Sequence, residues 1–128
     1  METKEYYTKA VESYVNAYNR FDINGMCVNL SKKIVFENIS GGNAEMRIEG
    51  IENFKKQAET AKAYFSERHQ IIENLSFNGH VATAEIDYTG ILATDLPNGM
   101  KKGDTLKLKG ISEFTFENDE IVSIRDIS

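Results

Sequence analysis

The spacing of apolar side chains changes along the chain, and this change limits the folds that it can adopt. In the first half, apolar and aromatic residues recur every three or four positions in several segments, the period of a helix face buried against a core. In the second half they alternate with polar residues, as in strands that bury one face. Helices followed by a run of strands predict an α+β fold in which a sheet packs against the helices.

Three segments carry the helical period. The first covers about residues 5–20 and presents a stripe of aromatic side chains. Asp22 is placed to cap a short second helix. The third segment begins near Gly50 and keeps the same spacing up to Phe65. These segments predict three amphipathic helices in the N-terminal half of the chain.

The other segments predict the strands of one sheet. Ile34, Phe36 and Asn38 share one face of the first strand. The dipeptide 78–79, Asn-Gly, is a strong hairpin signal between two long strands, and a second hairpin is expected to turn at residues 118–119. We therefore expect a cone-like, curved antiparallel sheet that wraps the three helices.

The size and charge of the chain limit the number of domains and the kinds of partner that it can have. Its 128 residues suffice for one domain with its own core, so we expect a single domain over residues 1–128. A net charge of -5 and a pI near 5.1 repel phosphate backbones and anionic lipids, so neither nucleic acid nor a membrane is an expected partner. The N-terminal segment lacks the apolar stretch of a secretory signal, which favours a cytoplasmic protein. No Cys or His spacing indicates a metal site, and we expect no metal and no cofactor.

Polar residues on the inward faces are the candidates for a functional site. Burying such a group without a partner costs on the order of 1–3 kcal/mol, so it either finds a partner or lines a cavity. Groups of this kind that converge from several elements would form a ligand pocket. The candidates are Tyr14, Asn38, His69, Glu73, Ser112 and Asp126.

Each candidate also has a purely structural interpretation. Tyr14 belongs to an aromatic stripe of the kind that usually packs in a core. Asn38 is also compatible with the end of a strand, and Ser112 with a hydroxyl bonded to a neighbouring carbonyl. His69 is compatible with a histidine paired in the interior or at the rim, and Glu73 with a position at the sheet edge or in solvent. Asp126 lies close to the C-terminus, where strands often fray. The segment 93–104 contains several turn formers and two apolar residues, which is compatible with a flap over a cavity mouth or with a solvated loop.

Two stretches of the chain resemble a known family. Residues 14–38, YVNAYNRFDINGMCVNLSKKIVFEN, resemble the start of ketosteroid isomerase and of its nuclear transport factor 2-like and SnoaL-like relatives. Residues 108–126, LKGISEFTFENDEIVSIRD, resemble the closing hairpin of SnoaL-like proteins. The resemblance implies a cystatin-like, nuclear transport factor 2-like fold and a single SnoaL-like domain over residues 1–128. Because this superfamily includes enzymes and pure binding proteins, it implies no single activity.

The resemblance also assigns roles to individual positions. Tyr14 matches the isomerase tyrosine that donates a hydrogen bond to the enolate oxygen, and Ser112 stands at the position of a second, acidic donor. Asn38 stands at the position of the catalytic base, but a neutral amide is no base near pH 7. SnoaL-like cyclases are expected to place an acidic residue near the end of the sheet, where Asp126 lies, and His69 is its candidate partner. The expected ligand-binding residues are Asn38, Ser112, Tyr18, Phe36, Phe54 and Phe114.

Two functions remain open. One is a cyclase or isomerase that transfers a proton at an enolisable carbonyl compound, with Asp126, His69 and Tyr14 as its catalytic residues. The other is a non-enzymatic domain that binds a ligand or another protein. In either case we expect the ligand to be a small apolar or carbonyl-bearing molecule. We expect a homodimer for two reasons. Proteins of the families that the chain resembles commonly form dimers, and the helices leave uncovered the strand face that carries residues 83, 85, 87 and 89.

Overall fold

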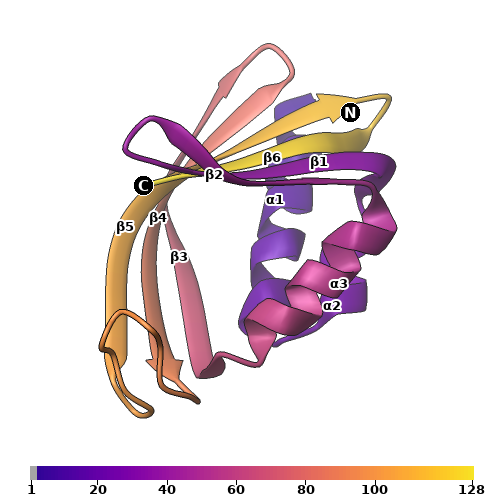
Figure 1. Ribbon diagram of the computed structural model, residues 1–128. Helices are drawn as coiled ribbons and strands as arrows, with labels where there is room; N and C mark the ends of the chain where they lie inside the picture. Colours follow the sequence, from indigo (N-terminus) through magenta and orange to yellow (C-terminus); the bar gives the residue numbers. More distant parts are fainter. Residues whose placement is uncertain (1–2) are drawn as a thin grey trace.

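The computed structural model describes residues 3–128, which form three helices and one six-stranded sheet. In chain order the elements are α1 (Thr3–Asn19), α2 (Ile23–Cys27), β1 (Leu30–Ser40), β2 (Asn43–Glu49), α3 (Ile51–Lys62), β3 (Phe65–Asn78), β4 (Val81–Leu92), β5 (Thr105–Glu117) and β6 (Glu120–Ile127). The strand order across the sheet is β2-β1-β6-β5-β4-β3. The sheet curves strongly, and the helices lie on its concave side (Figure 1).

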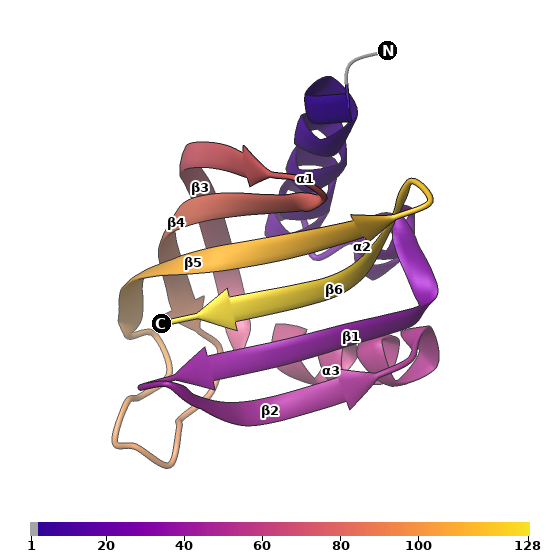
Figure 2. The same cartoon turned by 90° about the horizontal axis from the view of Figure 1, so that it is seen from above.

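This arrangement confirms the predicted α+β class, with a curved sheet that wraps three helices. One strand pair differs from the prediction. β1 and β6 run parallel, with Phe36 paired to Ile124, whereas every other neighbouring pair is antiparallel. The direction of β6 is set by its hairpin with β5, and β6 meets β1 only in space (Figure 2). An alternation pattern cannot reveal a direction that arises from such a long-range contact.

Local contacts fix the ends of the helices. The Asp22 side chain accepts a hydrogen bond of 2.9 Å from the backbone N–H of Gly25 and so caps α2, as the sequence predicts. At the C-terminal end of α1, Asn19 exchanges two hydrogen bonds with the backbone of Gln70 on β3. α3 ends at Lys62, earlier than its apolar spacing suggests. The helices are therefore tied to the sheet at defined positions.

The core lies between the helices and the concave face of the sheet. Val11 of α1 and Phe114 of β5 are among its fully buried side chains. Ile34 of β1 and Ile121 and Ile124 of β6 complete this apolar layer. Burial of large side chains from elements far apart in the sequence stabilises the fold by roughly 1.5–3 kcal/mol for each side chain.

β3 contains a bulge at Glu73, where its pairing with β4 shifts by one residue. A bulge reverses which residues face the core on its two sides. C-terminal to it, Leu75 packs against the core, as the alternation predicts. N-terminal to it the predicted face is wrong, because His69 is exposed and Arg68 takes the buried position. Glu73 itself is also exposed.

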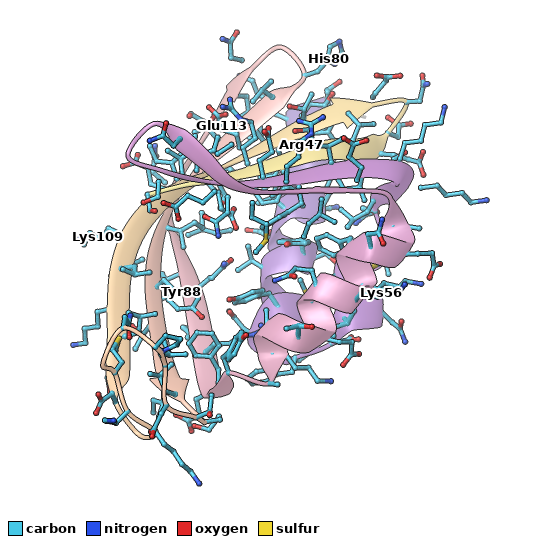
Figure 3. All side chains as sticks on the ribbon, viewed as in Figure 1. Arg47, Lys56, His80, Tyr88, Lys109 and Glu113 are labelled. Carbon is cyan, nitrogen blue, oxygen red and sulfur yellow. The ribbon has the colours of Figure 1, made fainter. Side chains whose placement is uncertain are left out.

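The outer face of the sheet carries a row of alternating charges. Arg47, Glu37, Arg125 and Glu113 lie side by side on β2, β1, β6 and β5. Their ion pairs measure 3.4, 3.6 and 3.2 Å in that order. Figure 3 shows Arg47 and Glu113 on the side of the sheet away from the helices. This part of the outer face is therefore polar and faces solvent.

Candidate functional site

A cavity of about 270 Å³ lies against the concave side of the sheet, next to the C-terminal end of α1. Its apolar wall includes Phe65, Ile86, Leu106 and Leu108. Six of its polar residues are contributed by α1 and by five strands, namely Tyr18, Asn38, Gln70, Tyr88, Ser112 and Asp126, and Lys109 and Ser128 also border it. An apolar hollow with a few converging polar groups is the usual form of a small-molecule site.

Three of these polar residues form a row across neighbouring strands. Asn38 on β1 is paired with Asp126 on β6, and Asp126 is paired with Ser112 on β5. The Ser112 hydroxyl donates a hydrogen bond of 2.7 Å to Oδ1 of Asp126. The structure therefore brings together three of the residues that the sequence selects as candidates.

The carboxyl group of Asp126 has unusual acid-base properties. Asp126 is only partly buried as a residue, but protein atoms surround its carboxyl group closely. This burial raises the pKa of Asp126 from 3.8 to about 6, while the hydrogen bond from Ser112 acts in the opposite direction. A carboxyl group that titrates near neutral pH can take up and return a proton under ordinary conditions.

Tyr14 does not line the cavity. It is buried in the core, and its ring packs edge-on against Phe114 at 5.6 Å between centroids. Burial raises the pKa of Tyr14 well above its ordinary value, and the nearby charge of Asp126 adds to this effect. Phe114 is part of the same core, and Phe54 packs against Phe36 at 5.9 Å. None of these four aromatic residues is among the lining residues of the cavity.

His69 lies away from Asp126. Because of the bulge in β3, its side chain is exposed, next to a separate hollow that it shares with Thr89 of β4. The expectation that His69 faces Asp126 across the cavity is therefore wrong. Of the two predicted proton-transfer groups, Asp126 alone is a lining residue of this cavity.

The cavity also contains functional candidates that the sequence interpretation missed. Tyr88 and Gln70 line it, and the Tyr18 hydroxyl donates a hydrogen bond of 3.0 Å to the Tyr88 hydroxyl. The alternation already places Tyr88 on the same face of its strand as Ala82, Ala84 and Ile86. Gln70 and the neighbouring buried Arg68 had no such signal, because the bulge in β3 hides their orientation.

The loop between β4 and β5 does not cover the cavity. None of residues 93–104 is among its lining residues. The loop is instead held by its own side chains, because Asp95 accepts a hydrogen bond from the backbone of Lys102 and Asp104 accepts one from the backbone of Lys101. This geometry favours the solvated-loop interpretation. Within residues 3–128, no cluster of three or more His, Cys, Asp or Glu side chains is arranged to hold a metal ion.

The family of the chain follows from a comparison of its sequence with family models. The model described as SnoaL-like domain matches residues 11–124, which is most of the chain. The chain belongs to the SnoaL-like domain family. The match confirms the resemblance seen in residues 14–38 and 108–126. No curated protein sequence matches this SnoaL-like domain significantly.

Solved structures confirm the fold of this SnoaL-like domain. A protein from Xanthomonas campestris pv. campestris, proposed to be a polyketide cyclase, has 21% identity and a TM-score of 0.84, and the match covers 99% of this chain and 93% of that one. A ketosteroid isomerase-like protein from Catenulispora acidiphila, in complex with trimethylamine, has 15% identity, a TM-score of 0.74 and coverage of 91% and 82%. A cystatin-fold protein from Novosphingobium aromaticivorans has 15% identity, a TM-score of 0.72 and coverage of 94% and 96%. At such identities the likeness concerns the fold alone.

Among residues 3–128, none of the helices combines the length and the apolar character needed to cross a bilayer.

Proposed function

We propose that this SnoaL-like domain binds a small, largely apolar carbonyl compound in its cavity and transfers a proton at a carbon next to the carbonyl group. The observation that carries this proposal is the carboxyl group of Asp126, a lining residue of the cavity, whose pKa is raised by burial to about 6. The Xanthomonas relative, proposed to be a polyketide cyclase, is compatible with it, because polyketides contain enolisable carbonyl groups.

In this mechanism Asp126 acts as a carboxylate above its pKa and removes the proton. The hydrogen bond from Ser112 holds Oδ1, while Oδ2 accepts no hydrogen bond within the described residues and is available to the ligand. The protonated Asp126 then returns the proton to another carbon, which gives isomerisation. If the enolate instead attacks a second carbonyl group of the same molecule, a C–C bond forms, the attacked carbonyl becomes an alkoxide that takes the proton from Asp126, and the result is cyclisation. Asn38 beside Asp126 offers a neutral hydrogen-bonding group to the ligand.

A second candidate function is ligand binding without catalysis. One observation favours it: of the three residues in the row across β1, β6 and β5, only Asp126 is ionisable, while Asn38 and Ser112 are neutral. A single carboxylate with neutral neighbours also suits the recognition of a hydroxyl or amine group. The two functions differ in whether a proton leaves the ligand.

Deuterium exchange separates the two functions. We suggest 2-tetralone as a probe, because it combines an aromatic ring with exchangeable protons beside a carbonyl group. In D₂O near pH 7.5, the wild-type protein should accelerate the loss of the α-proton signal in NMR spectra. Asp126→Asn should reduce this acceleration by roughly 100-fold or more, as expected for the loss of a general base.

The matched control is Asp119→Asn, the same substitution in the exposed turn between β5 and β6, outside the cavity. It should leave the exchange rate unchanged. Equal exchange rates for wild type and Asp126→Asn would exclude Asp126 as the base. Ligand-detected NMR that shows binding of 2-tetralone without any exchange would favour the binding domain.

A further inference from the structure

Tyr18 and Tyr88 form a pair of hydroxyl groups at the edge of the cavity. The two oxygen atoms lie 3.0 Å apart, and both residues line the cavity. Each hydroxyl has one hydrogen, so one hydrogen of the pair stays free whichever of them donates. With Tyr18 as the donor, the free hydrogen belongs to Tyr88, which donates to no other group within residues 3–128. The pair is therefore able to donate a hydrogen bond to a ligand.

A buried positive charge lies behind this pair. The guanidinium group of Arg68 stacks over the ring of Tyr18 at 3.7 Å from its centroid and lies 4.5 Å from that of Phe21. Its Nε donates to the carbonyl oxygen of Tyr18 at 2.9 Å, while its Nη2 is buried without a hydrogen-bond partner. No carboxylate among the described residues forms an ion pair with Arg68. A buried cation without a counter-ion stabilises negative charge in its vicinity.

The packing holds Tyr88 in place. Phe65 contacts the ring of Tyr88 edge-on at 6.0 Å, and Tyr18 contacts it in the same way at 6.2 Å. Gly90 makes room for this arrangement, because a Cβ atom there would lie 2.8 Å from the ring of Phe65 and 3.2 Å from that of Tyr88. A donor fixed in this way needs little reorganisation when charge develops in front of it.

The position of Tyr88 relative to Asp126 suits one small ligand. Tyr88 is paired with Leu108 on β5, whereas Asp126 is paired with Ser112 on the same strand. These two positions on β5 are four residues apart, or about 13 Å along an extended strand. Strand β5 bends (Figure 1), and Tyr88 and Asp126 line the same cavity, so the gap between them is shorter than this extended length. A ligand of one or two rings would bridge it.

We propose that Tyr88, supported by Tyr18 and Arg68, donates a hydrogen bond to the ligand oxygen that becomes negatively charged. The ligand class is thus a ring compound whose carbonyl or phenolic oxygen carries charge as an enolate or a phenolate. This inference rests on the proposed function only in using the same cavity. It moves the role of oxyanion donor from Tyr14, which the family resemblance implies, to a tyrosine that lines the cavity.

The probe for this inference is 4-nitrophenol, whose absorbance changes when it ionises. We choose the Asp126→Asn protein as the background, because its neutral side chain does not repel a bound anion and because the measurement then requires no proton transfer by Asp126. Near the pKa of free nitrophenol, excess protein should increase the absorbance of the phenolate form. The absorbance of nitrophenolate does not depend on the exchange of 2-tetralone. The two experiments therefore show separately whether Tyr88 is the donor and whether Asp126 is the base.

Tyrosine variants in this background test the donor. Tyr88→Phe should weaken phenolate binding by roughly 10- to 100-fold, the range for a hydrogen bond to a charged group. Tyr18→Phe should weaken it less. Tyr7→Phe is the matched control, because the Tyr7 hydroxyl contacts His80 at 3.0 Å and does not line the cavity. It should leave phenolate binding unchanged.

Variants of Arg68 test the charge behind the pair. Arg68→Met should weaken phenolate binding, and Arg68→Lys should retain more of it; if Arg68→Met does not fold, the tyrosine variants decide. An absorbance spectrum that does not change with excess Asp126→Asn protein would overturn the inference. Equal phenolate affinities for Tyr88→Phe and Tyr7→Phe would also overturn it. The same holds if Tyr14→Phe lowers the phenolate affinity and Tyr88→Phe does not.

Discussion

The Ser112 hydroxyl donates a 2.7 Å hydrogen bond to the carboxyl group of Asp126 from the neighbouring strand. The bond favours the charged carboxylate, while burial favours the protonated form and has the larger effect. The two residues together therefore set the pH at which Asp126 changes charge.

Ser112→Ala should move the pH profile of proton exchange. Because the substitution removes the bond that lowers the pKa of Asp126, this pKa should rise further above about 6. The rate of 2-tetralone exchange should then reach half of its maximum at a higher pH than in the wild type. Ser76→Ala, at an exposed position of β3, is the control and should keep the wild-type profile. A profile of Ser112→Ala that stays unshifted would contradict a direct effect of this bond on Asp126.

Asp126→Asn should change how stability depends on pH. The pKa of Asp126 is raised on folding, so between about pH 4 and pH 6 the folded protein holds a proton that the unfolded chain has lost. The free energy of unfolding of the wild type should therefore fall as the pH rises through this range. Asp126→Asn removes the titrating group, so its free energy of unfolding should not fall in this way. The variant should be more stable than the wild type at pH 7.5, by on the order of 1–3 kcal/mol. Urea unfolding at pH 4 and pH 7.5 measures this, and an equal difference at both pH values would contradict it.

Gly90→Ala should damage the cavity wall. The added Cβ atom would lie 2.8 Å from the ring of Phe65, so this ring or the β4 backbone has to move. We expect a loss of stability of roughly 1–3 kcal/mol and weaker nitrophenolate binding, because the contact between Phe65 and Tyr88 is disturbed. Thr89→Ala, at an exposed neighbouring position, should change neither property. Unfolding curves and absorbance titrations provide the two measurements.

Glu37→Gln should weaken the row of charges on the outer face. Glu37 forms ion pairs with both Arg47 and Arg125, and its side chain is 20% exposed, whereas those of the two arginines are about half exposed. Because the pairs are partly screened by solvent, the expected loss of stability is about 1 kcal/mol or less. It should shrink further at high salt. Unfolding in low and high concentrations of NaCl tests this, and a loss that is independent of salt would point to packing instead.

The outer face of β3, β4 and β5 provides a prediction about assembly. Exposed Ile71 lies in one row with Asp87 and Lys109, and exposed Ile111 lies nearby on β5. The Lys109 side chain extends outward from β5 (Figure 3), although Lys109 also borders the cavity. Opposite charges beside apolar side chains are able to pair with a second copy of the same surface, so we propose a homodimer. Lys109→Glu should then shift sedimentation toward the monomer, while a wild-type protein that is monomeric at micromolar concentration would exclude the dimer.

The sequence predicts the architecture better than it predicts the site. The alternation in β1, β5 and β6 identifies Asn38, Ser112 and Asp126 as inward candidates, because period and burial are local properties of a strand. Their contact with one another depends on strand order and register, which arise from long-range pairing. The inward position of Arg68 is hidden by one extra residue in β3.

Tyr14 shows a further limit of the sequence. A position on a buried helix face is compatible with both a core and a cavity, and the choice depends on how far the sheet curves. In the structure Tyr14 packs against Phe114. The alternation in β4 places Tyr88 on the inward face, but no sequence pattern pairs it with Tyr18.

The parallel pairing of β1 and β6 has a consequence for folding kinetics. β6 lies in the middle of the sheet although it is the last strand in the chain, so Asn38 and Asp126 become neighbours only when it inserts between β1 and β5. Contacts between such distant segments form slowly, because a large loop has to close first. Before this step, β1 and β5 each expose an unpaired edge that is prone to association. The recovery of the Asp126 site during refolding should therefore coincide with the end of this aggregation-prone stage.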